Sequence, residues 1–221
     1  MSLSVDDLIG RLGADLRPVR RLRPPLARAA LWLAAVAALA LGLASLARLG
    51  AIEHRLMAVP DMWAATLGAA LTTVLAAVAT FELSLPDRRP SWALLPLPAL
   101  ALWIGASGLG CLRHWVIPDM HPATMRDSGD CFTFIVGLSI PLSILTVLMI
   151  RRACPLRPNL TAATGGLAVA AAAATLLTFF HPYDASAIDM AVHAGAVTLV
   201  VAGNRLLGGW LLAPKIFSGR P

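Results

Sequence analysis

The sequence predicts an all-α membrane protein with six transmembrane helices and with the N- and C-termini in the cytoplasm. Six apolar stretches each have about the 20 residues that an α-helix needs to cross a hydrocarbon core of about 30 Å. They lack the alternation of apolar and polar residues that barrel strands show, and a bilayer admits only helices or closed barrels. The 221 residues are 58% hydrophobic and only 14% charged, whereas soluble domains carry about 25% charged residues.

The apolar stretches set the expected domain limits. We expect helices over residues 29–47, 62–81, 91–110, 132–150, 160–180 and 190–212. Residues 29–213 then form the transmembrane domain. Residues 1–28 precede it as a cytosolic segment long enough to bind a partner, and residues 214–221 form a short cytosolic tail.

Two features inside the apolar stretches bear on packing. Pro96 and Pro98 lie in the first turns of the third expected helix, where proline predicts a kink. In the fifth expected helix, Gly165 and Gly166 precede an alanine run at 170–174. Small side chains let membrane helices approach closely, so the fifth helix is expected to pack tightly against its neighbours.

The orientation follows from the basic residues. The N-terminal segment, the second and fourth loops and the C-terminal tail hold Arg11, Arg17, Arg20, Arg21, Arg23, Arg28, Arg88, Arg89, Arg151, Arg152, Arg157, Lys215 and Arg220. The other three loops hold Arg48, Arg55, Arg113 and Arg126. Because cytoplasmic loops of membrane proteins are enriched in Lys and Arg, both termini are predicted to be cytoplasmic.

The charge and the motifs also exclude several classes of protein. The net charge of +6 follows the membrane topology, and no stretch resembles a soluble nucleic-acid-binding module, so we expect no direct nucleic-acid binding. The sequence shows no nucleophile beside an oriented base, no phosphate-binding loop and no paired catalytic carboxylates. We therefore expect no enzyme and no cofactor.

The N-terminal segment contains a short amphipathic helix. Ser4 is an expected N-cap, followed by Asp6 and Asp7 in the first turn. An apolar stripe at helical spacing follows the cap: Val5, Leu8, Ile9, Leu12 and Leu16. Pro18 predicts the end of this helix. A basic amphipathic segment of this kind can lie on anionic lipid or can dock into the groove of a soluble partner, and the physics leaves both open.

The third loop is bracketed by Cys111 and Cys131 and is predicted to be periplasmic. In an oxidising compartment two such thiols can form a structural disulfide. They can also serve as a redox switch or as a soft-metal site, because thiolates react with oxidants and bind soft metals. The candidate additional metal ligands are His114, His121 and His181, although their spacing matches no zinc motif.

Asp189 and His193 are separated by four residues, so they share one face of the sixth expected helix. An acid and a histidine near the end of a membrane helix are costly unless they are paired. The pair is expected to form an internal hydrogen bond, and protonation of the histidine would allow a sensory role.

Several of these motifs together resemble a known family. The string from Asp6 to Leu22, which includes Asp15, Leu16 and Arg17, resembles the N-terminus of the negative-regulator-of-sigma-F family, which comprises bacterial six-helix inner-membrane anti-sigma factors. The resemblance continues through Cys111-Leu112-Arg113, residues 129–132, Arg151-Arg152 and residues 181–193.

The resemblance implies that the cytosolic N-terminus holds an extracytoplasmic-function (ECF) sigma factor at the bacterial inner membrane and releases it on a periplasmic metal or oxidant stress. The implied partner-binding residues are Asp6, Asp7, Leu8, Ile9, Leu12, Asp15, Leu16, Arg17, Arg20 and Arg21. The implied sensing residues are Cys111 and Cys131. Some relatives carry a cysteine beside the fifth-loop histidine, whereas here His181 precedes Pro182, which favours a pair within the third loop.

Two alternatives belong to other classes. A membrane thiol oxidoreductase would use Cys111 and Cys131, but neither belongs to a Cys-X-X-Cys pair. A small transporter would need an ionisable pair near the bilayer midplane, and the sequence offers no convincing one.

Overall fold

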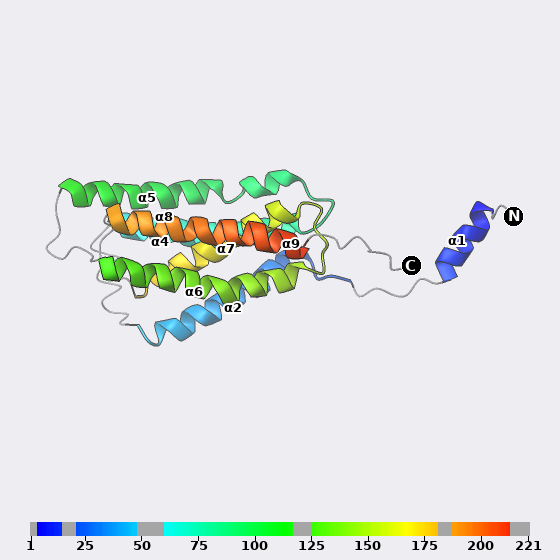
Figure 1. Ribbon diagram of the computed structural model, residues 1–221, viewed down its shortest axis with the longest axis horizontal. Helices are drawn as coiled ribbons and strands as arrows, with labels where there is room; N and C mark the ends of the chain where they lie inside the picture. Colours follow the sequence, from blue (N-terminus) through cyan, green and yellow to red (C-terminus); the bar gives the residue numbers. More distant parts are fainter. Residues whose placement is uncertain (1–3, 15–20, 48–59, 117–124, 181–186, 213–221) are drawn as a thin grey trace.

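The structure is a computed structural model that describes residues 4–14, 21–47, 60–116, 125–180 and 187–212. All regular elements within these ranges are helical (Figure 1). They are α1 (Val5–Ala14), α2 (Pro25–Ala44), α4 (Pro60–Leu83), the 3-10 helix η1 (Pro90–Leu94), α5 (Leu97–Val116), α6 (Met125–Ile150), α7 (Pro158–Leu177), α8 (Ala187–Gly203), the π-helix η2 (Asn204–Gly208) and α9 (Gly209–Leu212). Six of the resulting segments are long and apolar enough to span a membrane, as predicted.

Several helices begin before the apolar stretches that predicted them, while α2 and α7 end three residues early, at Ala44 and Leu177. α2, α4 and α7 each begin at a proline, which suits the first turn of a helix because its missing N–H has no partner there in any case. α6 begins at Met125 rather than at the expected residue 132, and α5 continues to Val116. Cys111 and Cys131, which were expected to bracket the third loop at the ends of the third and fourth helices, therefore lie inside the last turns of α5 and the first turns of α6.

The third span is interrupted at its prolines, as predicted. The 3-10 helix η1 ends at Leu94, and α5 starts at Leu97. Pro96 has no N–H to donate, but its carbonyl accepts the first α5 hydrogen bond, from Leu100 N–H at 2.9 Å. The sixth span is interrupted as well, since α8 passes into the π-helix η2 before α9. Sequence patterning did not indicate this second break.

α7 is the central helix of the bundle. Of its apolar window, 78% is buried, compared with 50% for α4 and 28% or less for the other spans. It contacts α4, α6, α8, η2 and α9, and Figure 1 shows it enclosed among them. The glycines and alanines of α7 make this possible, because small side chains leave room for neighbouring helices on every side.

Gly166 of α7 gives the sharpest test of this packing. A Cβ at this position would lie 2.8 Å from Asn204 Cβ and 3.0 Å from Val201 Cα, so one helix would have to shift. We expect Gly166→Ala to destabilise the bundle by about 1–3 kcal/mol, measured as a lower thermal midpoint in detergent. Gly137→Ala in α6 is the matched control, because its Cβ would meet nothing within 4 Å. Equal midpoints for the two variants would contradict a close α7–η2 contact.

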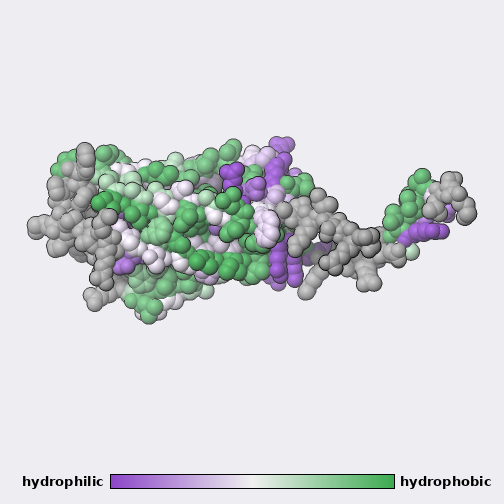
Figure 2. Space-filling model, in the orientation of Figure 1, coloured by the Kyte–Doolittle hydropathy of each residue, from purple (hydrophilic) through white to green (hydrophobic). Residues whose placement is uncertain are grey.

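The bundle has two chemically different ends. We call the end where α2 begins and α9 ends the termini end, and the end where α6 and α8 begin the far end. Figure 2 shows hydrophilic residues gathered at the termini end beside a mostly apolar bundle surface. The α4–η1 and α6–α7 connections contribute Arg88, Arg89, Arg151, Arg152 and Arg157 there.

α2 is attached to the bundle mainly near the termini end. Its fully buried residues are Arg28, Ala29 and Trp32, all in its first turns. Arg28 Nη2 donates to Ser84 Oγ at 2.7 Å and to the Phe81 carbonyl at 3.4 Å, and the guanidinium lies 5.4 Å from the Phe81 ring centre. Trp32 Nε1 donates to Thr146 Oγ1 of α6 at 2.9 Å. The helix that follows the N-terminal segment is therefore fixed by polar contacts on α4 and α6.

Candidate functional site

The first candidate site is α1. Ser4 caps it as predicted, because its Oγ accepts a hydrogen bond from the Asp7 N–H at 3.2 Å. Leu8, Ile9 and Leu12 form the expected stripe and are 48%, 61% and 62% exposed. An exposed row of large aliphatic side chains on one helix face is typical of a surface that binds a partner.

The backbone of α1 also favours a binding role. A ten-residue helix is marginal in water on its own, and Gly10 and Gly13 each reduce its helix propensity by about 1 kcal/mol relative to alanine. Every described residue of α1 is exposed, so within the described part of the chain nothing packs on its apolar face. Stabilisation must therefore come mainly from burial of the stripe against another surface.

Only some of the remaining predicted partner-binding residues are among those that the structure describes. Asp6 and Asp7 are exposed in the first turn of α1, and Arg21 is exposed in the irregular segment that precedes α2. The others lie outside the described residues: Asp15, Leu16, Arg17 and Arg20.

The second candidate site is at the far end of the bundle. Cys111 is half-buried on α5, and Cys131 is buried on α6. No disulfide joins any of the cysteines that the structure describes, so the Cys111–Cys131 bond stays a prediction. Cys154, in the α6–α7 connection, is an exposed thiol at the termini end.

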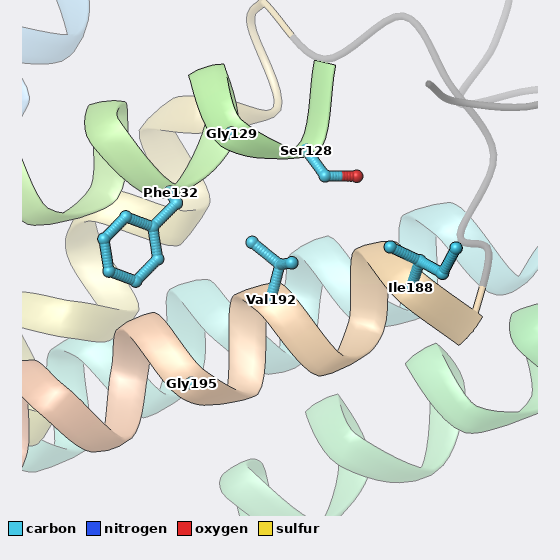
Figure 3. A pocket seen from close by; sticks show the side chains of 6 residues that line it. All are labelled: Ser128, Gly129, Phe132, Ile188, Val192 and Gly195. Atoms are coloured by element: carbon cyan, nitrogen blue, oxygen red, sulfur yellow. The ribbon is translucent and has the colours of Figure 1, made fainter. Parts of the chain in front are cut away.

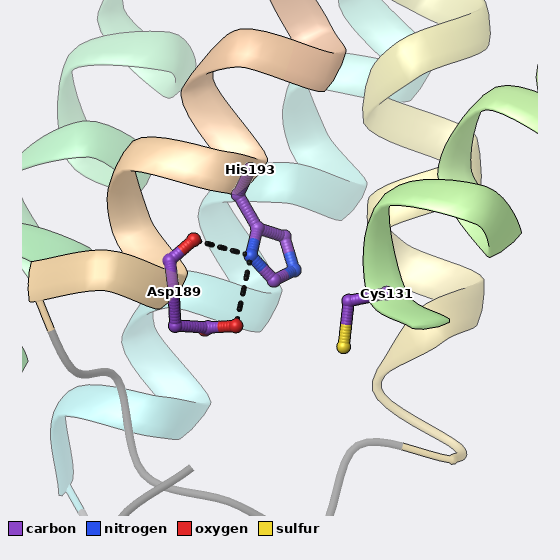
Figure 4. Close-up of side chains that lie close together, drawn as sticks. All are labelled: Cys131, Asp189 and His193. Carbon is purple, nitrogen blue, oxygen red and sulfur yellow. Dashed lines mark hydrogen bonds and ion pairs between the residues drawn. The ribbon is translucent and has the colours of Figure 1, made fainter. Parts of the chain in front are cut away.

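Cys131 is grouped instead with Asp189 and His193 of α8 (Figure 4). The sulfur, a carboxylate oxygen and a ring nitrogen all lie within 4.8 Å of one another. His193 Nδ1 lies 2.8 Å from the Asp189 carbonyl oxygen and 3.4 Å from its Oδ1. The internal pairing predicted for Asp189 and His193 is therefore confirmed, and the cysteine is the member that sequence reasoning missed.

Topology could have indicated this grouping. Cys131 is near the start of the fourth span, while Asp189 and His193 are near the start of the sixth. In an antiparallel succession of spans, the fourth and sixth run in the same direction, so their first turns lie at the same end. The sequence cannot reveal that α6 and α8 are neighbours, which depends on tertiary packing.

The histidines proposed as additional metal ligands are not tested. His114 belongs to α5, but its side chain is outside what the structure describes, and His121 and His181 lie outside the described residues altogether. Among the side chains that the structure describes, His193 lies beside a cysteine, Cys131.

A groove lies between α6 and α8 next to this cluster (Figure 3). It has a volume of about 420 Å³ and is lined by Ser128, Gly129, Phe132, Ile188, Val192 and Gly195. Ser128 is only 2% exposed, and its Oγ has no hydrogen-bond partner among the described residues. The groove therefore separates the α6 and α8 side chains that line it, whereas Cys131 itself is packed in a buried cluster with Ala196 of α8.

Comparison with known proteins decides the class. The chain matches the family described as negative regulator of sigma F over residues 12–213, which is nearly its whole length. The chain belongs to the negative regulator of sigma F family. The family implies negative regulation of a sigma factor, so its partner is a sigma factor and its role is regulatory. No curated protein and no solved structure matches the chain.

The family match covers only part of the predicted partner-binding segment of the negative regulator, because it begins at residue 12. Leu12 and the residues after it lie inside the match, whereas Asp6, Asp7, Leu8 and Ile9 precede it. The binding role predicted for the first turns of α1 is therefore supported only by their geometry, which is a capped helix with an exposed apolar stripe.

Proposed function

We propose that this negative regulator is a membrane-anchored anti-sigma factor that sequesters an ECF sigma factor through its N-terminal segment. The main support for the proposal is the exposure of the Leu8, Ile9 and Leu12 side chains on one face of α1. A sigma factor held on this face at a membrane is kept from RNA polymerase. Six helices able to span a bilayer supply the anchor.

The proposed orientation places the termini end in the cytoplasm of a bacterial inner membrane. The arginines of the α4–η1 and α6–α7 connections support it, because positive charge is retained on the cytoplasmic side. The N-terminal segment shares that end and its charge, with Arg20, Arg21 and Arg23 leading into α2. A sigma factor and the anionic inner leaflet would both be within reach of this segment.

The binding roles follow from residue chemistry. Leu8, Ile9 and Leu12, continued by Leu16, would be buried in an apolar groove of the sigma factor, as amphipathic peptide helices are. Asp6, Asp7 and Asp15 would face basic groups of the partner. Arg17, Arg20 and Arg21 would pair with acidic groups of the partner or with lipid phosphates.

The release signal is proposed to arise at the far end, which this orientation places in the periplasm. A metal ion or an oxidant would act on thiols there, with Cys111 and Cys131 as the candidates. Helix rearrangement in the bundle would then change the presentation of the N-terminal segment.

Co-expression of the full chain with the ECF sigma factors of its source organism, one at a time, tests the proposal. We expect one of them in the membrane fraction when the chain is present and in the soluble fraction when it is absent. Fluorescent-protein fusions to either terminus should fluoresce, as cytoplasmic fusions do. Sigma factors that all stay soluble, or an N-terminus located outside the cytoplasm, would refute the proposal.

A further inference from the structure

The cluster of Cys131, Asp189 and His193 has the donor atoms of a metal site. It offers one sulfur, one carboxylate oxygen and one imidazole nitrogen from two helices, all within 4.8 Å of one another. Tetrahedral zinc bonds of about 2.0–2.3 Å place ligand atoms about 3.5 Å apart, so the three groups need to approach by about 1 Å. Side-chain rotation supplies movements of that size.

The hydrogen bond of His193 prepares it as a ligand. The Asp189 carbonyl oxygen can only accept, so His193 Nδ1 must donate the hydrogen in their 2.8 Å contact. The neutral ring then carries its lone pair on Nε2, which Figure 4 shows on the side of the ring that faces Cys131. Metal-binding histidines are commonly oriented in this way, by a hydrogen bond from the other ring nitrogen.

The surroundings of the cluster allow a cation to enter and the three ligand side chains to approach it. Cys131 and Asp189 are 6% and 4% exposed, but the His193 side chain is 23% exposed and provides access. All three residues lie within the first turns of their helices, at the end of the bundle. The groove beside them leaves space between the α6 and α8 side chains that line it (Figure 3).

We propose that Cys131, Asp189 and His193 bind one thiophilic divalent cation of the zinc and cadmium class. A thiolate with an imidazole selects borderline and soft metals over Mg²⁺ and Ca²⁺. Three protein ligands leave a fourth position for water, unlike the four protein ligands of a closed structural zinc site. Cys111 is not a member of this set.

The same site would serve as the input of the regulator, and this part rests on the proposed function. A cation that joins Cys131 of α6 to two residues of α8 draws these helices together. α6 also accepts the Trp32 hydrogen bond through Thr146, and α2 directly follows the N-terminal segment. A shift of α6 at the far end would thereby change the position of α2 at the termini end.

Cobalt titration of the full chain in detergent tests the site without any sigma factor. Co²⁺ alone should bind at one equivalent and should give the near-ultraviolet charge-transfer band of a thiolate–cobalt bond. Cys131→Ser should abolish that band. His193→Ala and Asp189→Asn should weaken binding by at least about tenfold, the minimum effect of removing even an outer partner of a metal ligand.

Cys154→Ser, at the opposite end of the bundle, is the matched control and should keep the band and the affinity. Helical circular dichroism and size-exclusion profiles verify that each variant remains folded. Absence of cobalt binding, or a band that survives in folded Cys131→Ser, would overturn the site.

A second measurement separates the site from the proposed function. Zn²⁺ or Cd²⁺ added to membranes that carry the sigma complex should release the sigma factor from the wild type and not from Cys131→Ser. Cobalt binding without zinc- or cadmium-dependent release would overturn the regulatory role of the site. Failure of the sigma factor to bind the membranes at all would instead count against the proposed function.

Discussion

Replacing Leu8 and Leu12 together by aspartate is expected to abolish retention of the sigma factor at the membrane. Both side chains lie on the exposed apolar face of α1, 48% and 62% exposed, where partner binding would bury them. A buried apolar anchor is worth about 2 kcal/mol or more, or about 30-fold in affinity. Each aspartate also places an unpaired charge in an apolar groove. The measurement is the dissociation constant of the full chain in detergent for its sigma factor.

Gly10→Asp provides the matched control for this pair. It introduces one negative charge, where the double leucine variant introduces two, on the opposite side of α1, and a Cβ at Gly10 would meet nothing within 4 Å. Its dissociation constant should remain within a few fold of the wild-type value. If Gly10→Asp and the double leucine variant weakened binding equally, the effect would be one of overall charge and not of a docking face.

Replacing Trp32 by alanine is expected to cause the largest loss of stability among the substitutions considered. Its side chain is 1% exposed within the main core cluster, and its Nε1 donates to Thr146 Oγ1 at 2.9 Å. Removal of a buried tryptophan costs about 3–5 kcal/mol through the cavity it leaves. Because Trp32 is one of the few fully buried residues of α2, this helix should also detach from the bundle. The thermal midpoint in detergent measures the loss.

Two variants separate the contributions of Trp32. Trp63→Ala in α4 removes a tryptophan that is 52% exposed, so its midpoint should change little. Trp32→Phe keeps a smaller aromatic ring and loses the hydrogen bond, and the loss of the hydrogen bond alone should cost about 1 kcal/mol. Thr146 Oγ1 would still donate to the Leu142 carbonyl at 2.7 Å. A Trp32→Ala midpoint equal to that of Trp63→Ala would show that α2 is not held at this point.

Much of the fold could be predicted because the bilayer imposes few solutions. A stretch of about 20 apolar residues must satisfy its own backbone hydrogen bonds, so the six spans follow from composition and length alone. The same holds for the interruption at Pro96, which has no N–H, and for the tight packing of α7 around Gly165 and Gly166. The Ser4 cap and the stripe of α1 are equally local, because side chains within one turn of each other determine them.

The ends of the helices and the residues that form the far-end cluster were harder to predict from the sequence. Hydropathy placed the start of α6 near residue 132, but a helix continues through polar residues as long as its backbone bonds are satisfied, so it begins at Met125. Cys111 and Cys131 were therefore expected at the limits of the third loop, whereas they lie within α5 and α6. The pairing of Asp189 with His193 was readable from their spacing, because it is made within one helix turn.

The amino-acid sequence by itself therefore determined the six spans, the capped N-terminal helix and the charge difference between the two ends, since each depends on neighbouring residues or on the membrane. The tertiary structure decided which helices are neighbours. Only the packing of α6 against α8 brings Cys131 to Asp189 and His193, and only the packing of α2 against α4 and α6 buries Arg28 and Trp32. These contacts join residues more than 50 positions apart in the chain, as with Arg28 and Ser84 at a separation of 56, and no local pattern encodes such a meeting.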